Sequence, residues 1–375
     1  AASDVYKRQV VNNLKVYGVE NIKEVIEFFN NERNLEPSIV NTREEFYEHQ
    51  SSFPYDFADV KGQESVKRAL EVAASGGHNL IMIGSPGSGK SMMAKCMPSI
   101  LPPLSLGESL ETTKIHSVAG KLGKDSSLIA IRPFRSPHHT ISQVAMVGGG
   151  TNPQPGEISL AHNGLLFLDE LPEFNRSVLE VLRQPLEDRH ISIARAKYSL
   201  DYPASFMLVA SMNPCPCGYY NHPTRACVCN PGQVQRYLNR ISGPLLDRID
   251  IQIEIVPVPF EKMAERHHAE SSASIRERVI KAREIQAQRF ANHPGIYCNA
   301  QMEAGLLHLY AQPNEAGLKL LRTAMTRLNL SARAYGRILK VARTIADLDN
   351  SEHITSIHLA EAISYRNLDR EDWAG

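Results

Sequence analysis

The sequence lacks an excess of charge of either sign and lacks any long apolar run. Its 41 Lys and Arg residues balance its 41 Asp and Glu residues, so no global field draws the chain to nucleic acid or an anionic membrane. A nucleic-acid partner would therefore need a local basic patch. No apolar stretch approaches the roughly 20 residues that span a bilayer, and the first residues lack the hydrophobic region of a secretory signal. We therefore expect a cytoplasmic protein.

An initiating Met is also missing, so we expect either a fragment of a longer protein or first residues that are not native. Cysteine is scarce and unevenly placed, because four of the six Cys residues lie within fifteen positions. Without a secretory signal, such clustering favours reduced thiols that bind a metal over a set of disulfides.

The apolar pattern divides the chain into three predicted regions. Residues 1–50 indicate the remnant of an earlier domain and a linker, with a strand at Val10–Tyr17 and a helix at Ile22–Asn30. Residues 51–262 alternate helical patterns with short buried-strand patterns at 79–83, 164–168, 206–211 and 249–255. This alternation predicts an α/β fold with a doubly wound parallel sheet. Residues 263–375 contain helical patterns, which predict an all-helical second domain.

A glycine-rich segment follows the first strand predicted in the α/β region. It reads Gly84-Ser85-Pro86-Gly87-Ser88-Gly89-Lys90-Ser91 and fits the pattern G-x-x-x-x-G-K-S. The backbone N–H groups of such a loop cradle phosphate oxygens, and its glycines avoid side-chain clashes. Lys90 is expected on the β and γ phosphates and Ser91 on Mg²⁺. A chance match is the alternative, but a strand before and a helix after favour a site for ATP with Mg²⁺.

Two carboxylates follow another predicted strand. Asp169 and Glu170 come directly after the apolar run Leu165–Leu168, and ligands of parallel sheets bind at the carboxyl ends of the strands. Asp169 would lie near Mg²⁺, and Glu170 would polarise the attacking water. The alternative is a solvated pair at a strand exit, which the glycine-rich segment makes the weaker interpretation.

Several segments together resemble a known family. Phe57–Glu64, Gly84–Ser91, Arg132–Thr140 and Gly164–Glu170 resemble the Mg-chelatase-like AAA+ ATPases, which place a helical lid domain after the P-loop core. Two further segments, Ser211–Gly218 and Ser242–Asp250, are similar to the ComM/YifB subfamily. The resemblance covers about residues 10–368. Full-length members begin with a domain similar to the S5/Lon-protease fold, of which only the tail is present here.

The resemblance implies roles for four further residues. Val60 corresponds to the adenine-side segment, and Asn213 corresponds to sensor 1, which helps to place the water. Arg248 corresponds to the arginine finger, which reaches the γ-phosphate in a neighbouring subunit, and Arg333 corresponds to sensor 2 in the lid. An always-charged planar guanidinium suits the negative charge that spreads over a transferring phosphoryl group.

Alternatives remain for both arginines. Arg248 could instead form a surface salt bridge with Asp247 or Asp250, and Arg337, one turn after Arg333, could serve as sensor 2 in its place. The family also implies a homo-oligomeric ring, with six subunits as the family expectation. Its ComM members are associated with ATP-driven DNA helicase and branch-migration work during natural transformation.

The clustered cysteines form a C-x-C array followed by a second one. Cys215, Cys217, Cys227 and Cys229 offer four thiolates, which suit a structural tetrahedral Zn²⁺. The loop between them has little apolar mass, so a metal could substitute for a core. Free thiols or a redox pair are the alternatives, and His222 could replace one Cys. Cys96 and Cys298 are expected to be ordinary thiols.

A β-hairpin is predicted from His190 to Ala204, before the third sheet strand. Arg195 and Lys197 would lie near its tip with Tyr198 beside them, where cations could contact DNA phosphates and the ring could stack on a base. A solvated hairpin is the alternative. We expect a second insertion, from about Thr112 to Gly156, to face the pore of the ring. Its basic residues are Lys114, Lys121, Lys124, Arg132, Arg135, His138 and His139.

Three classes of function are therefore compared. A ring that couples ATP hydrolysis to movement along single-stranded or branched DNA is favoured by the Cys array and by Ser242–Asp250. The alternative enzyme is an ATP-dependent remodeller of a protein complex, as in magnesium chelatase subunit I. A non-enzymatic scaffold is disfavoured, because the loop lysine, the acidic pair and Asn213 are all present.

Overall fold

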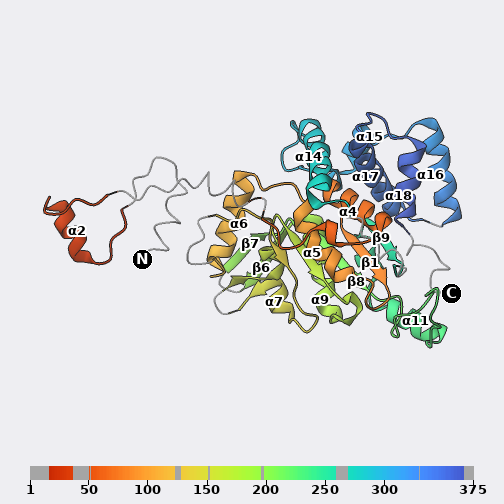
Figure 1. Cartoon of the computed structure of the whole chain (residues 1–375), viewed down its shortest axis with the longest axis horizontal. Coiled ribbons are helices and arrows are strands. Elements are labelled where there is room, and N and C mark those ends of the chain that lie inside the picture. Colours follow the sequence, from red (N-terminus) through yellow and green to blue (C-terminus); the bar gives the residue numbers. More distant parts are fainter. Residues whose placement is uncertain are drawn as a thin grey trace. The chain divides into compact units, whose positions relative to one another are not determined.

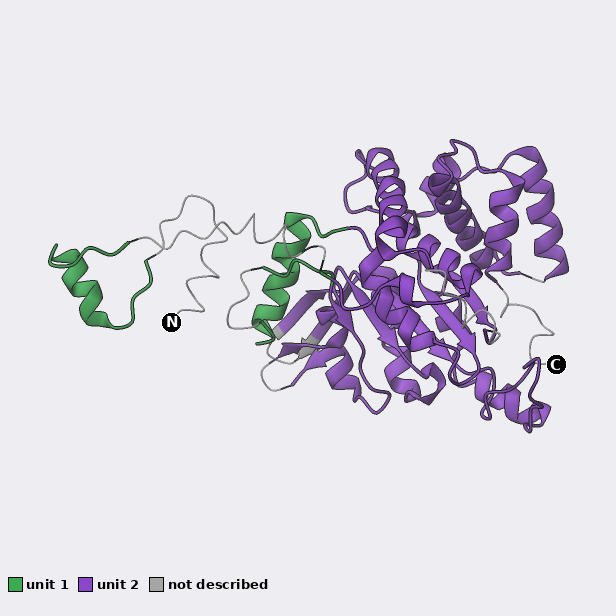
Figure 2. Cartoon of the chain, viewed as in Figure 1, with its two compact units in different colours: residues 1–52, 103–132 green, residues 53–102, 133–375 purple. Residues whose placement is uncertain are grey.

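The structure is a computed structural model that describes residues 17–36, 50, 52–122, 128–150, 153–195, 198–258, 269–328 and 330–366. The chain divides into two compact units (Figure 2). Unit 1 comprises residues 1–52 and 103–132, and unit 2 comprises residues 53–102 and 133–375. Within the described residues, no helix combines the length and the apolar character that a bilayer crossing requires.

The described part of unit 1 contains two helices with clear N-terminal capping. Helix α2 (Ile22–Phe29) confirms the expected helix, and the Asn21 side chain caps it by accepting from the backbone of Glu24. Helix α6 (Leu106–Val118) begins with a capping box in which Ser105 and Glu108 exchange side-chain and backbone hydrogen bonds. The predicted strand at Val10–Tyr17 lies, except for its last residue, outside the described part of the chain.

Unit 2 is built on a five-stranded parallel sheet with the order β2-β5-β8-β1-β9 (Figure 1). Its strands are β1 (Leu80–Gly84), β2 (Phe134–Arg135), β5 (Leu165–Leu168), β8 (Met207–Met212) and β9 (Ile251–Ile255). The four predicted strands are confirmed. Strand β2 was missed, because two residues carry no recognisable period. β1 pairs with β8 and with β9, so the phosphate loop follows an internal strand of the sheet.

Both faces of the sheet are covered by apolar clusters. Successive side chains of a strand point to opposite faces, so each strand contributes to both clusters. Leu80 and Met82 pack into one apolar cluster with helices α4 (Glu64–Gly76) and α5 (Lys90–Ile100). Ile81 and Ile83 pack into a second cluster on the other face. The remaining short elements of the α/β region are η2 (Phe57–Asp59), α7 (Gln143–Val147), β3 (Gly148–Gly149), β4 (Gln154–Pro155), α8 (Glu157–Leu160), η3 (Leu171–Glu173), α9 (Arg176–Glu180), α10 (Arg183–Asp188), β6 (His190–Arg195), β7 (Tyr198–Pro203), α11 (Pro231–Leu238) and α12 (Gly243–Leu246).

The C-terminal region is helical, as predicted, and it shares the first apolar cluster with α4 and α5. Ile275 and Val279 of one helix and Ile338 of another belong to this cluster. The elements are α14 (Ser272–Arg289), η4 (Asn299–Gln301), α15 (Ala304–Tyr310), α16 (Glu315–Arg327), α17 (Ala332–Leu348) and α18 (Ser356–Ser364). Burial of apolar area therefore stabilises these helices against α4 as well as against one another.

Candidate nucleotide and metal sites

The glycine-rich segment forms a loop between the end of β1 and the start of α5. Gly89 lies immediately before the helix with φ of 88°, a left-handed conformation that disfavours a side chain. Helix α5 begins at Lys90, and no side chain caps its N-terminus. The first N–H groups of the helix are thus available to an anion, which the positive end of the helix dipole also attracts.

Lys90 lies within this loop and contacts a second predicted site residue. Its Nζ donates to the carbonyl oxygens of Gly84 at 2.7 Å and Ser85 at 2.9 Å, and to Oδ1 of Asn213 at 3.3 Å. Burial lowers the pKa of Lys90, while the negative charges of Asp169 and Glu170 act in the opposite direction. The structure therefore brings the loop ammonium and the predicted sensor 1 residue together at the carboxyl end of the sheet.

Asp169 links three elements of the site. Its carboxylate accepts a hydrogen bond from Ser91 Oγ at 2.7 Å and another from Ser211 Oγ. Ser91 belongs to α5 and Ser211 to β8, so hard oxygen ligands from adjacent elements meet beside the phosphate loop. Mg²⁺ prefers such ligands and is usually held by one or two of them together with substrate phosphates. Ser91 and Asp169 therefore fit the Mg²⁺ that the family implies.

Glu170 directly follows Asp169 and has an unusual backbone conformation. Its backbone is left-handed, with φ of 54°, and its N–H donates to Asp169 Oδ1 at 3.1 Å. Its own carboxylate is more than half exposed and lies 3.6 Å from Nδ1 of His139. A solvent-accessible carboxylate next to the candidate metal ligands is suitably placed to polarise a water molecule.

Two contacts of the acidic pair were not predicted. The hydroxyl of Ser211 had no assigned role, and His138 and His139 were named only as basic residues of the second insertion. His139 instead contacts the carboxylate of Glu170, and its ring lies 4.0 Å from that of His138 between centroids. The only available signal was the position of both histidines inside the segment Arg132–Thr140, and sequence separation gives no distance to Glu170.

The predicted arginines form ion pairs within their own chain. Arg248 is 9% exposed, and its guanidinium contacts Glu187 Oε1 at 2.6 Å and donates to the carbonyl of Arg183 at 3.1 Å. Arg333 is well exposed and lies 3.1 Å from Asp247. The arrangement brings neither guanidinium to the phosphate loop, and their roles as finger and sensor 2 stay predictions.

Arg337 has a different environment from Arg333. It forms an ion pair with Asp250, a buried carboxylate that also accepts a hydrogen bond from the backbone of Asn79 at 3.0 Å. His78 is fully buried on the other side, with Nδ1 at 3.6 Å from Asp250 and Nε2 at 2.8 Å from the hydroxyl of Thr344. This cluster connects the residues just before β1 and β9 with helix α17.

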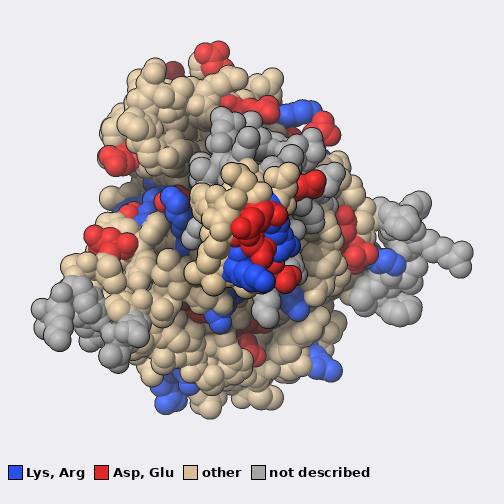
Figure 3. Space-filling view, turned by 90° about the vertical axis from the view of Figure 1, so that its left-hand side faces the viewer, with Lys and Arg blue, Asp and Glu red and all other residues tan. Residues whose placement is uncertain are grey.

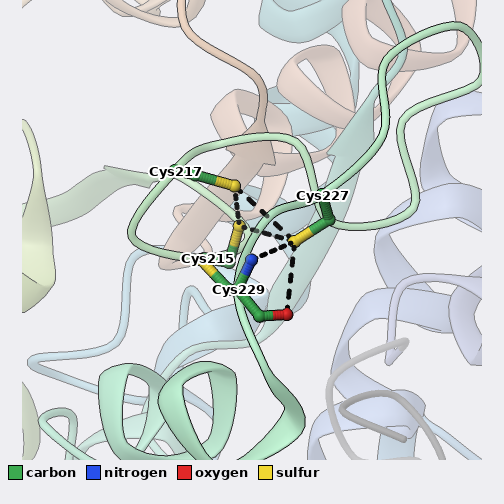
Figure 4. Close-up of side chains that lie close together, drawn as sticks. All are labelled: Cys215, Cys217, Cys227 and Cys229. Atoms are coloured by element: carbon green, nitrogen blue, oxygen red, sulfur yellow. Dashed lines mark hydrogen bonds between the residues drawn. The ribbon is translucent and has the colours of Figure 1, made fainter.

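The four clustered cysteines converge on one point (Figure 4). Cys215 Sγ lies 3.3 Å from that of Cys217 and 3.7 Å from that of Cys227, and the latter two are 3.6 Å apart. All four sulfur atoms, including that of Cys229, lie within 4.8 Å of one another. Tetrahedral zinc with Zn–S bonds of about 2.3 Å separates its sulfurs by about 3.8 Å, so the donor set fits zinc.

His222 and the two cysteines outside the cluster have separate environments. All six cysteines are unbridged, and Cys96 and Cys298 are buried. Nδ1 of His222 accepts from the backbone of Thr224 at 3.2 Å, so this atom faces its own turn. Desolvation acts to raise the pKa of Cys217, but the backbone amides of Tyr219 and Val228 lower it to about 6.

The predicted hairpin is present as β6 and β7. Arg195 pairs with Tyr198 in its register, their side chains are not among the described ones, and Lys197 lies outside the described residues. Ile193 is buried, and its Cδ1 atom would lie 3.3 Å from a Cβ atom added to Gly148. The hydroxyl of Tyr202 donates to the carbonyl of Pro153 at 3.3 Å. The hairpin therefore packs against the β3–β4 part of the second insertion.

Among the described basic residues of the second insertion, both arginines are paired with carboxylates. Arg132 pairs with Glu108 at 3.0 Å, and Arg135 pairs with Glu157 at 2.6 Å. Lys114 and Lys121 are exposed, and Lys124 lies outside the described residues. On the face drawn in Figure 3, the described Lys and Arg side chains are interspersed with Asp and Glu. On that face, contact with DNA phosphates would depend on local cations.

Comparisons with known proteins agree with this geometry. The family model described as "Magnesium chelatase, subunit ChlI" matches residues 56–263, and the model of the ChlI C-terminal region matches residues 269–366. The chain is 42% identical to the competence protein ComM of Haemophilus influenzae over 372 residues, which cover 99% of this chain and 71% of ComM. It is 48% identical to YifB of Salmonella typhimurium over 319 residues, 84% of this chain and 61% of YifB. Similarity to the magnesium-chelatase 38 kDa subunit of Rhodobacter capsulatus is lower, with 25% identity over 43% of this chain and 50% of that subunit.

Proposed function

The chain belongs to the magnesium-chelatase ChlI-like family of AAA+ ATPases, and on that premise we propose that it hydrolyses ATP to drive movement along DNA. The family implies ATP with Mg²⁺. One observation supports this assignment most directly. Ser91 Oγ donates to the carboxylate of Asp169 at 2.7 Å, and Lys90 beside them contacts Asn213. A scaffold without catalysis has no need for these groups at one end of a parallel sheet.

Each residue of this site has a proposed part in hydrolysis. The backbone of the loop from Gly84 to Ser91 holds the triphosphate, and Lys90 contacts its β and γ phosphates. Bound Mg²⁺ would supply charge neutralisation at the phosphates, held by Ser91 and Asp169. Glu170 polarises the attacking water, and Asn213 helps to position it. Val60 contacts the adenine side of the nucleotide.

We also propose how the regions cooperate. Residues 51–262 form the AAA+ core, and residues 263–375 form the lid. AAA+ ATPases typically oligomerise, and a ring of six such chains would place Arg248 as a finger toward a neighbouring nucleotide. Because Arg248 is paired with Glu187, ring assembly would have to exchange that ion pair for the γ-phosphate.

Similarity to ComM and the form of the hairpin support DNA as the substrate of movement. ComM is named a competence protein, and this chain covers 71% of its length. The β6–β7 hairpin has one apolar face, and its buried Ile191 and Ile193 belong to the second apolar cluster. Arg195, Lys197 and Tyr198 would provide cations for phosphates and a ring for stacking.

We propose a structural role for zinc at the four cysteines. The array directly follows Asn213, so a metal there would stiffen the segment that carries the sensor 1 residue. The loop from Cys215 to Cys229 has little aliphatic side-chain mass, and a metal can replace the missing apolar core.

The test of the DNA proposal is the ATP turnover rate with and without DNA. We expect single-stranded or branched DNA to raise turnover several-fold. If DNA leaves turnover unchanged while a protein complex raises it, the chain is a remodeller of the magnesium-chelatase type instead. The lower similarity to the chelatase subunit, with 25% identity over 43% of this chain, makes that alternative the weaker one.

A salt titration of single-strand binding tests the hairpin itself. Replacing Arg195 and Lys197 with Ala should lower the dependence of log K on log salt by about two phosphate contacts. The matched control replaces Lys319 and Arg322 with Ala on the exposed face of α16. An unchanged slope in the hairpin variant would mean that another element contacts the DNA.

A further inference from the structure

A cavity of about 630 Å³ lies beside the phosphate loop. Its inner side consists of the predicted nucleotide residues, with Val60, Met92 and the loop from Ser85 to Gly89. This volume lies within the range of cavities that hold cofactor-sized ligands. The position next to the phosphate loop makes it the place where the base and sugar of a bound nucleotide would lie.

The cysteine loop, for which the sequence indicated a metal site, also lines this cavity. Tyr219, His222 and Arg225 line it. The Arg225 guanidinium lies 5.0 Å from the centre of the Tyr219 ring and donates to its hydroxyl at 2.6 Å. The His222 ring meets the same Tyr219 ring edge-on, with 5.5 Å between the centroids. These three side chains therefore form one connected group on the wall of the cavity.

Two cysteines flank this group in the sequence. Cys217 precedes Tyr219 by two residues, and Cys227 follows Arg225 by two residues. The two sulfur atoms are 3.6 Å apart, so one metal ion would close the whole turn at its base. Closing a loop removes conformational freedom that a ligand would otherwise have to restrict on binding.

The same loop also contacts the phosphate loop directly. Gly218 has φ of 84°, and a Cβ atom placed there would lie 2.5 Å from Cδ of Pro86. Only glycine therefore allows the cysteine loop to approach the phosphate loop so closely. A displacement of the cysteine loop would move the wall of the cavity relative to the phosphate loop.

We propose that the metal-bound cysteine loop is the outer wall of the nucleotide site, with Tyr219 and Arg225 contacting the base and sugar of ATP. Metal binding at the four cysteines then controls nucleotide affinity. A flat aromatic ring and a guanidinium are both suited to stacking on a purine. This inference rests on the proposed ATP site and adds a second set of binding residues to it.

The experiment compares two ligands by titration calorimetry in the presence of Mg²⁺. ATP contacts both the phosphate loop and the proposed wall, whereas inorganic tripolyphosphate has no base or sugar and contacts the loop alone. Tyr219→Ala and Arg225→Ala should each weaken ATP binding about tenfold, the size expected when one stacking contact is lost. Both variants should bind tripolyphosphate as the wild type does, which also shows that they are folded. The matched controls are Tyr297→Ala and Arg322→Ala, two exposed residues of the helical region.

The metal is tested on the wild-type protein and on a variant. Chelation of bound zinc, or Cys217→Ser combined with Cys227→Ser, should weaken ATP binding at least as much as Tyr219→Ala does. Adding zinc back should restore affinity in the wild type only. Unchanged ATP affinity in the Tyr219 and Arg225 variants, or in the zinc-free protein, would overturn the inference. Failure of the wild type to bind either ligand would overturn the proposed ATP site itself.

Discussion

Replacing Arg337 with Met should destabilise the chain far more than replacing Arg333 with Met. Arg337 neutralises Asp250, which is 3% exposed. Among the described residues its other close ionisable neighbour is His78, and burial lowers the pKa of that ring. Arg333 instead pairs with Asp247 at the surface, where 69% of its side chain is exposed. The two candidate sensor 2 residues therefore differ in how much the fold depends on them.

The size of the effect follows from burial. Removing one partner of a buried ion pair costs about 3–5 kcal/mol of unfolding free energy, whereas an exposed pair contributes about 0–1 kcal/mol. Lys340 also acts on Asp250 and would retain part of the compensation, so we expect about 3 kcal/mol for Arg337→Met. Arg333→Met should cost less than about 1 kcal/mol.

The loss should also depend on pH. Desolvation acts to raise the pKa of Asp250, but Arg337 and His78 outweigh it and hold that pKa well below its usual range. A depressed carboxylate pKa stabilises the fold above the unfolded value near 4, and this contribution is lost as the pH falls through the folded pKa. Without Arg337, the largest influence that lowers the pKa of Asp250 is gone and desolvation raises that pKa relative to the wild type. A proton then relieves the unpaired buried charge more readily at lower pH, so the destabilisation should be greater at about pH 8 than at about pH 5.5.

Urea denaturation at both pH values measures these free energies. A double variant, Asp250→Asn with Arg337→Met, should recover part of the stability because no unpaired charge remains buried. A loss below about 1 kcal/mol for Arg337→Met at pH 8, or equal losses for both arginines, would refute this reasoning. Loss of ATP turnover in Arg333→Met with its stability intact would support Arg333 as sensor 2.

Three further predictions concern catalysis and the metal. Arg248→Ala should keep ATP binding but lower hydrolysis by about a thousandfold, the effect of removing an arginine finger, and normal turnover would exclude that role. Cys217→Ser with Cys227→Ser should abolish a 1:1 zinc content in metal analysis, and a wild type without zinc would favour free thiols. His139→Ala should lower kcat about tenfold, through misplacement of Glu170, with unchanged ATP affinity; an unchanged kcat would assign the contact to structure alone.

Each of these variants has a matched control nearby. Glu187→Gln removes the partner of Arg248 without removing the guanidinium, and it should leave hydrolysis near the wild-type rate. Cys96→Ser changes a buried thiol outside the cluster and should keep the zinc. His138→Ala removes the neighbouring ring and should affect kcat less than His139→Ala does.

Much of the fold was predictable because parallel strands are buried on both faces. The continuous apolar runs around Leu80, Leu166 and Val209 identified three central strands, and the helical spacing after residue 270 identified the C-terminal helices. Strand β2 could not be found, because Phe134 and Arg135 are held by pairing with β5 rather than by their own pattern. Short strands depend on tertiary pairing more than on propensity.

The core of the site was predictable from motif chemistry, and its surroundings were not. Lys90, Ser91 and Asp169 meet as their motifs implied, because the sheet brings strand ends together. The contact of His139 with Glu170 and the wall formed by Tyr219 depend on how insertions fold back over the sheet. Side chains that come from such insertions have no fixed spacing from the motifs they contact.

ATP binding and single-turnover hydrolysis by Glu170→Gln, measured beside the wild type, test the central claim most directly. The substitution keeps the shape of the side chain and removes the base, and the residues that hold the nucleotide remain. We predict that the variant binds ATP as tightly as the wild type, while the rate of hydrolysis falls at least about a hundredfold. Hydrolysis at the wild-type rate would contradict the assignment of this carboxylate, and absence of ATP binding in both proteins would contradict the site as a whole.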